Sequence, residues 1–119
     1  MEQSAAVLSL SALAQGTRLE AFRALVQHEP SGIAAGDLAR LLGVPQNTLS
    51  AHLTVLAHAG LIDSTRQGRS IVYRARLTQL LALILYLMKD CCRGRAEVCA
   101  PLLREITACL PETQGSICG

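Results

Sequence analysis

Aromatic side chains are scarce in this chain: its 119 residues include one phenylalanine, two tyrosines and no tryptophan. Half of the residues are nevertheless hydrophobic, and alanine and leucine are the commonest among them. Aliphatic residues of this kind favour helices over strands. We therefore expect a mainly α-helical chain, whose length is sufficient to bury one hydrophobic core.

Long hydrophobic runs are also missing. The longest, Leu80 to Met88, has roughly half the length that a bilayer-spanning helix requires, and no basic stretch precedes an apolar run at the N-terminus. We therefore expect a cytoplasmic protein with no membrane partner. The five cysteines are an odd number and fit free thiols in a reducing compartment better than a disulfide framework.

Charge is sparse but unevenly distributed. Residues 38–76 carry five arginines against a single aspartate, whereas the segments on either side carry no excess of positive charge. The net charge of +2 is too small to indicate a polyanionic partner by itself. Its concentration in one segment, however, favours a local contact with nucleic acid.

Two helices are predicted before residue 30. The spacing of Thr17 and Glu20 is that of a capping box, which would begin the second helix. Residues 29–32, Glu-Pro-Ser-Gly, end it. The first helix is predicted over residues 4–14, because apolar residues recur there every three positions, at Val7, Leu10 and Leu13.

The next two helical patterns are separated by only two residues. They cover Ala35 to Leu42 and Pro45 to His58, and Gly43 lies in the turn between them. So short a glycine-containing connection is typical of a helix-turn-helix, and Pro45 suits the first turn of the second helix. The leucines predicted to be buried are Leu38, Leu41, Leu42, Leu49, Leu53 and Leu56.

A basic β-hairpin is predicted after this pair. Residues 61–66 and 70–75 favour strands, and Gly68 suits a tight turn between them. Such a hairpin behind a helix-turn-helix is a wing. Thr78 would then cap a helix that is apolar on every face from Leu80 to Met88, which a small chain buries most easily against a second copy of itself. The predicted fold is a homodimeric winged helix-turn-helix, mainly α with a small β-hairpin.

Polar side chains cover the outer surface of the predicted second helix of the pair. Amide groups can pair bidentately with adenine, and hydroxyl and imidazole groups can contact base edges or phosphates. A solvated polar face is the alternative interpretation, which the basic hairpin directly downstream makes less attractive. The candidate DNA contacts are Gln46, Asn47, Thr48, Ser50, His52 and Thr54, with Arg66, Arg69 and Arg74 of the hairpin near phosphates.

The segments 37–62 and 66–73 resemble the ArsR/SmtB family of winged-helix metalloregulatory repressors, most specifically in Ser-Ala-His-Leu (50–53) and Ala-Gly-Leu (59–61). The resemblance covers roughly residues 5–90. It implies a cytoplasmic homodimer, not an enzyme, that represses its own operon until an ion binds. Because a dimer is symmetric, its operator should be an inverted repeat. Ala51 stands where many members have a basic residue, which puts one phosphate contact in doubt.

The family's usual ion sites are missing from the expected positions. Residues 37–42 contain no cysteine pair, and residues 77–88 contain no carboxylate or histidine. Three thiols lie instead within nine residues, at Cys91, Cys92 and Cys99. Thiolates select thiophilic ions, and three sulfurs suit trigonal As(III) or Sb(III) better than tetrahedral zinc. This pattern also resembles a subgroup of arsenite-responsive family members.

The spacing of these thiols imposes a geometric demand. In one continuous helix Cys92 and Cys99 would lie about 10.5 Å apart along the axis, too far for one ion. The chain must therefore fold back, which Gly94 permits. We expect residues 1–90 to form the DNA-binding and dimerisation domain, and residues 91–119 to form the inducer-binding segment and a final helix.

Other interpretations of the cysteines remain open. The ligand could be Cd²⁺, Pb²⁺ or Zn²⁺, or the thiols could sense oxidants. A thiol oxidoreductase is disfavoured because the chain has no Cys-x-x-Cys motif. Cys99 and Cys109 could simply be core residues of the final helix, and Cys118 could be an auxiliary ligand. No organic cofactor or small organic substrate is expected, and the spacing does not distinguish arsenite, antimonite and methylated arsenicals.

Overall fold

The computed structural model describes residues 1–88, 100–101 and 104–105. Met1–Leu83 form one compact unit, and the chain from Ile84 onward belongs to a second. The predicted domain boundary at residue 90 lies outside the described residues and stays a prediction. The elements are α1 (Gln3–Leu13), α2 (Gly16–Gln27), β1 (Ile33–Ala34), α3 (Ala35–Leu42), α4 (Gln46–His58), β2 (Ile62–Gln67), β3 (Ser70–Ala75) and α5 (Leu77–Met88).

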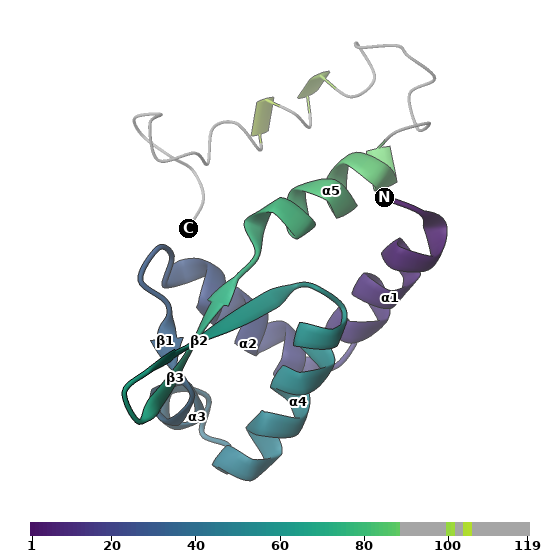
Figure 1. Cartoon of the computed structure of the whole chain (residues 1–119). Coiled ribbons are helices and arrows are strands. Elements are labelled where there is room, and N and C mark those ends of the chain that lie inside the picture. Colours follow the sequence, from purple (N-terminus) through teal and green to yellow (C-terminus); the bar gives the residue numbers. More distant parts are fainter. Residues whose placement is uncertain (89–99, 102–103, 106–119) are drawn as a thin grey trace. The chain divides into compact units, whose positions relative to one another are not determined.

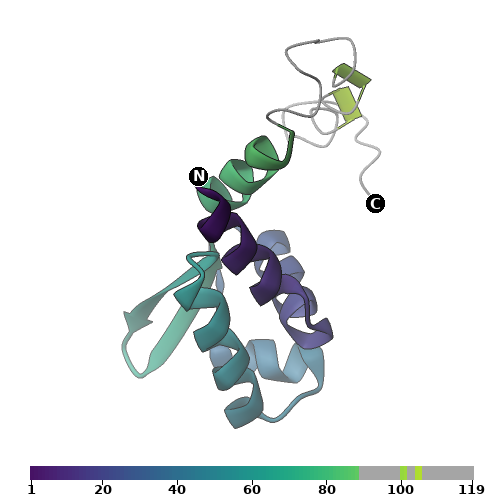
Figure 2. The same cartoon turned by 90° about the vertical axis from the view of Figure 1, so that its right-hand side faces the viewer.

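The core is formed by leucines of α2, α3 and α4 and by the start of the hairpin. Figure 2 shows α3 running crosswise to α4, as a helix-turn-helix requires. Gly43 ends α3 in the left-handed conformation that glycine adopts without strain. The fully buried leucines are Leu25, Leu38, Leu49, Leu53, Leu56 and Leu61, and each contributes roughly 1.5–3 kcal/mol through burial.

The hairpin is the larger part of a three-stranded antiparallel sheet of order β1-β3-β2 (Figure 1). Six cross-strand pairs join β2 to β3, from Ile62↔Ala75 to Gln67↔Ser70. Gly68, with a φ of 63°, lies at the turn, so the predicted wing is confirmed. The two-residue strand β1 was not predicted, because two residues are too few for a periodic pattern.

Helix α1 buries its small residues and leaves two of its larger apolar residues exposed. Val7 is 56% exposed and Leu10 is also exposed. The buried residues are the small ones, Ala6, Ser9 and Ala12. Both sets recur every three positions, but small side chains allow α1 to lie close against α2 and α4. The predicted first helix is therefore confirmed, but Val7 and Leu10, whose spacing predicted it, are not the residues that it buries.

The predicted cap of α2 was also wrong. The helix begins at Gly16, and the side chain of Gln15 accepts a hydrogen bond of 2.9 Å from the Arg18 amide. Thr17 therefore lies inside the first turn. The Arg18 guanidinium donates through Nε to the Ala12 carbonyl at 2.6 Å, which satisfies an end group of α1 and ties the two helices together.

Three smaller corrections concern α3, α4 and α5. Leu41 is 57% exposed, and Ala39 occupies the buried position instead. Pro45 is the N-cap of α4 and not its first helical residue. Helix α5 begins at Leu77, so Thr78 lies within it and does not cap it.

Among the described residues, no helix is long and apolar enough to cross a membrane.

Gly32 and Gly43 provide a matched test of close packing on β3. Both have positive φ, but a Cβ at Gly32 would lie 2.7 Å from the Tyr73 carbonyl oxygen, whereas nothing lies within 4 Å of one at Gly43. Gly43→Ala should cost about 1–2 kcal/mol of unfolding free energy for its backbone conformation alone. Gly32→Ala should cost more. Urea unfolding measures both, and equal losses would contradict the packing.

Candidate nucleic-acid interface

Helix α4 has one buried face and one outer face. Leu49, Leu53 and Leu56 are fully buried, as predicted. Successive residues are about 100° apart around a helix, so the opposite face carries Asn47, Ser50 and Thr54, which are all exposed. Three of the six predicted contacts on this helix therefore form one outward stripe.

The other three lie on the two flanks of α4. Gln46 is four residues before Ser50 and shares its side of the helix. Thr48 is about 200° from Ser50 around the axis, and His52 lies on that same far flank, where it is half-buried. The predicted set is therefore divided: Thr48 and His52 do not share the surface formed by the rest.

A cleft of about 380 Å³ lies between the helix-turn-helix and the wing. Gln46 and Ser50 line it from α4, and Arg69 lines it from the turn between β2 and β3. Two predicted residues of α4 and one of the wing are thereby brought to one cleft. The wing therefore flanks α4 on the side of Gln46 and Ser50, opposite to Thr48 and His52.

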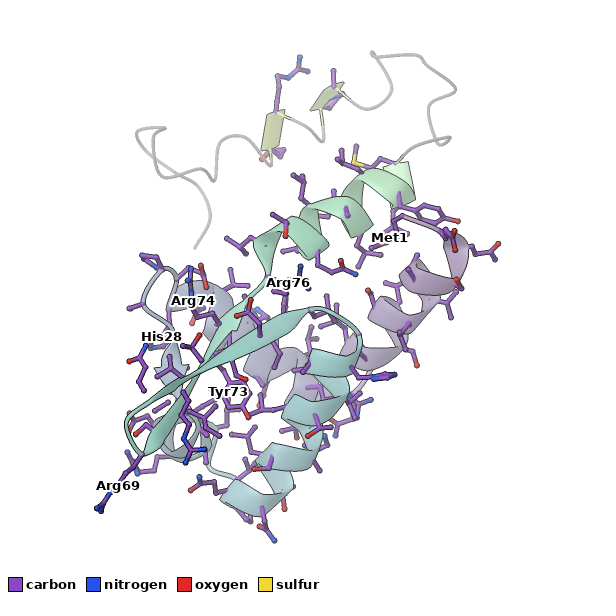
Figure 3. All side chains as sticks on the ribbon, viewed as in Figure 1. Met1, His28, Arg69, Tyr73, Arg74 and Arg76 are labelled. Carbon is purple, nitrogen blue, oxygen red and sulfur yellow. The ribbon has the colours of Figure 1, made fainter. Side chains whose placement is uncertain are left out.

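Arg66 and Arg69 are exposed cations at and near the tip of the wing. Within the described residues, neither forms an ion pair. Figure 3 shows Arg69 at the hairpin tip, extending away from the helices. Arg66 is paired with Ile71 across the hairpin, and paired residues share a face of the sheet. Because Ile71 lines the cleft, Arg66 lies on the face that the cleft occupies.

Arg74 lies elsewhere. It is five residues from the tip, about 16 Å along an extended strand, and strand alternation places it on the face opposite to Ile71 and Tyr73. Its Nη2 donates to Glu29 Oε2 at 2.8 Å, and its Nε donates to Oε1 at 3.3 Å. This hydrogen bonding and the negative charge of Glu29 raise the pKa of Arg74 above its ordinary value. Figure 3 shows how far Arg74 lies from Arg69.

Two charged groups in the cleft were not among the predicted contacts. Arg40 donates to Asp37 one turn earlier on α3, and both line the cleft. Their i, i+3 spacing and opposite charges could have identified the pair from the sequence.

On α4, the Thr54 hydroxyl donates to the Ser50 carbonyl at 2.9 Å, so the Thr54 oxygen can act towards a ligand only as an acceptor.

The predicted ion ligands Cys91, Cys92 and Cys99 lie outside the described residues, as do Cys109 and Cys118. In the part of the chain that is described, no three histidine, cysteine or acidic side chains come together in a metal-binding group. The thiols therefore remain a prediction from the sequence.

Comparison with known proteins agrees with this geometry. A helix-turn-helix domain model matches residues 13–65. The transcriptional activator HlyU of Vibrio cholerae is 30% identical over 89 residues, covering 75% of this chain and 80% of HlyU.

Two solved structures are also similar. An ArsR-like transcriptional regulator from Rhodococcus sp. RHA1 has a TM-score of 0.65 and 27% identity, over 88% of this chain and 89% of that one. A fragment from Mycobacterium bovis, described as a homodimeric winged helix-turn-helix DNA-binding domain, has a TM-score of 0.57 and 27% identity, over 73% and 85% of the two chains. These relatives agree with the winged fold and with the candidate interface on α4 and the wing. The chain therefore belongs to the ArsR family of DNA-binding transcriptional regulators.

Proposed function

We propose that this chain is a homodimeric repressor that binds an inverted-repeat operator and releases it when As(III) or Sb(III) binds the thiolates of Cys91, Cys92 and Cys99. The observation that carries the proposal is the position of these three thiols in the sequence. Cys91 follows only three residues after Met88, the last residue of α5, in a chain whose α4 and wing form a DNA interface.

Operator recognition is assigned to the outer stripe of α4 and to the wing. Asn47 can pair bidentately with adenine in the major groove, and Ser50 can contact a base edge. Arg66 and Arg69 would contact phosphates and so contribute affinity with little sequence preference. The cleft between α4 and the wing would then face the DNA backbone beside the groove.

Dimerisation is supported by the apolar surfaces of α1 and α5. Val7, Leu8 and Leu10 are exposed on α1, and Leu77 and Leu81 are exposed on α5. Large apolar side chains exposed on two helices favour association with another apolar surface. Gln79 of α5 joins the two helices through a hydrogen bond of 3.4 Å to Ser9 Oγ. A second copy of the chain is the proposed occupant, by analogy with the homodimeric fragment from Mycobacterium bovis.

The proposed release step couples the thiols to this dimer. Two recognition helices must lie on the order of 34 Å apart to enter successive major grooves. Folding residues 91–99 around an ion would alter the chain directly after α5 and thereby change that spacing. Release follows only if the ion binds the DNA-free conformation more tightly than the bound one.

The first prediction concerns the inducer. The DNA probe is a duplex selected from a random library by the wild-type chain. Arsenite should release the wild type from it and should fail to release Cys91→Ser or Cys92→Ser, because two thiolates cannot complete a three-sulfur site. A methylated arsenical needs only two thiolates, so Cys99→Ser should still respond to it. Fluorescence anisotropy of the labelled duplex measures release.

Cys109→Ser and Cys118→Ser are the matched controls, and both should respond to arsenite as the wild type does. Release by peroxide alone would indicate an oxidant sensor, and release by Cd²⁺, Pb²⁺ or Zn²⁺ alone a divalent-ion sensor. Because HlyU is described as an activator, a reporter gene behind the selected site gives the sign of regulation. Expression that falls on loss of the protein would contradict repression.

The second prediction separates the two sides of α4. Asn47→Ala should weaken binding to the selected duplex by about 1–3 kcal/mol, because a bidentate base contact is lost. Thr48→Ala is the control at the next position, about 100° around the helix on the flank far from the wing, and it should have a much smaller effect. Titration at fixed salt measures both. Equal losses would mean that α4 enters the groove in another orientation.

The third prediction concerns the dimer. Leu81→Glu should dissociate it, because a carboxylate would be buried in an apolar interface. Leu41→Glu is the control, since Leu41 is 57% exposed and Leu81 55%, but Leu41 belongs to α3. Analytical ultracentrifugation gives the mass of each variant. If Leu81→Glu remains a dimer, the interface does not include this side of α5.

A further inference from the structure

The loop between α2 and β1 binds β3 through an ion pair. The Glu29 carboxylate accepts from Arg74 through both of its oxygens, the two-point geometry that gives an arginine–carboxylate pair its directional strength. Glu29 is only 17% exposed, and Arg74 is 45% exposed. The residues are 45 positions apart in the sequence, so the pair holds two separate parts of the fold together.

The same loop contacts β3 through its backbone. Gly32 approaches β3 so closely that a Cβ would lie 2.7 Å from both the Tyr73 oxygen and Arg74 Cγ. The Gly32 amide donates to the His28 carbonyl at 2.8 Å, which fixes the loop to the end of α2. Directly after it, β1 pairs with β3 at Ile33↔Tyr73 and Ala34↔Val72. Three consecutive residues of β3 are thus held by one loop and strand.

These contacts lie on the middle of β3 and towards its base, not at the hairpin tip. Ser70 and Gln67, which flank the turn, pair only with each other. The direction of the tip relative to α4 therefore depends on how the base of β3 is held. Within the described residues, the Glu29–Arg74 pair is the one ion pair that joins the wing to the helices.

We propose that Glu29 and Arg74 are positioning residues for DNA binding: their ion pair holds the wing so that Arg66 and Arg69 reach the backbone while α4 lies in the groove, and neither residue touches DNA. This inference rests on the proposed operator binding. It replaces the expectation that Arg74 contacts a phosphate, and it assigns a function to an acidic residue of a DNA-binding protein.

The salt dependence of binding separates a positioning role from a phosphate contact. Arg69→Ala and Arg74→Ala each remove one guanidinium. Arg69→Ala should reduce the slope of log K against log salt concentration by about 0.9, the effect of one lost phosphate contact. Arg74→Ala should lower affinity about three- to tenfold with the slope unchanged. A slope reduced by about 0.9 in Arg74→Ala would overturn the proposal.

For Glu29→Ala, the positioning role and simple electrostatics predict opposite changes in DNA affinity. Removing a carboxylate makes the chain more positive, which by itself strengthens DNA binding. The positioning role predicts weaker binding instead, by a factor similar to that of Arg74→Ala, and no additional loss in the double variant. Tighter binding by Glu29→Ala would overturn the proposal. The exchanged pair, Glu29→Arg with Arg74→Glu, should recover most of the affinity, whereas a phosphate contact at Arg74 would stay lost.

A measurement without DNA distinguishes failure of this inference from failure of the proposed function. Amide hydrogen exchange at Val72 and Tyr73 should be faster in Glu29→Ala and Arg74→Ala than in the wild type, and unchanged in Arg69→Ala. Unchanged exchange in all three variants would mean that the pair does not hold the wing. If the wild type selects no duplex while exchange responds as expected, the operator-binding proposal fails and the structural role of the pair stands.

Discussion

The packing of α4 through Leu49, Leu53 and Leu56 is the constraint on which the rest of this structure depends. These side chains are fully buried in one cluster with leucines of α2 and α3. Because the inner face is held at three successive turns, rotation of α4 about its axis would expose apolar surface and bury polar groups. The outer face is therefore held in one orientation. A recognition helix needs this rigidity, since base contacts demand that side chains be placed accurately.

The sheet gives the wing a similar constraint through different physics. Strand β3 is central in the order β1-β3-β2, so both of its edges are hydrogen-bonded at its base. Alternate side chains of β3 point to opposite faces of the sheet, and the two faces have different neighbours. Ile71 and Tyr73 face the cleft beside α3 and α4, while Val72 and Arg74 face the loop that ends at Gly32. One face of the strand borders the candidate DNA surface, and the other holds the wing in position.

Helix α5 shows what a single chain leaves incomplete. Its sequence is apolar on all sides, yet within its described length only Leu83 is buried. Gln79 donates hydrogen bonds to Ser9 of α1 and to the Ala59 carbonyl directly after α4. These polar contacts join α5 to α1 and to the end of α4.

Local patterns in the sequence determined much of this fold. Helix α3 and strand β3 have the predicted bounds, and α4 begins one residue later than predicted. The reasons are local: leucines at helical spacing, a left-handed Gly43 that ends α3, and Gly68 in a two-residue hairpin turn. The outward residues Asn47 and Ser50 followed from the same periodicity. The three clustered thiols are visible in the sequence alone.

Tertiary structure decided what local patterns leave open. In α1, both the small and the large residues recur every three positions, and only the close approach of α2 and α4 selects Ala6, Ser9 and Ala12 for burial. Thr48 and Ser50 look equivalent in sequence, but the position of the wing makes one flank of α4 different from the other. The role of Arg74 depends on Glu29, 45 residues away. From the sequence, an arginine in a basic segment is predicted to contact a phosphate. Its carboxylate partner lies far away along the chain and leaves no signal in the neighbouring sequence, so only the fold shows the pair.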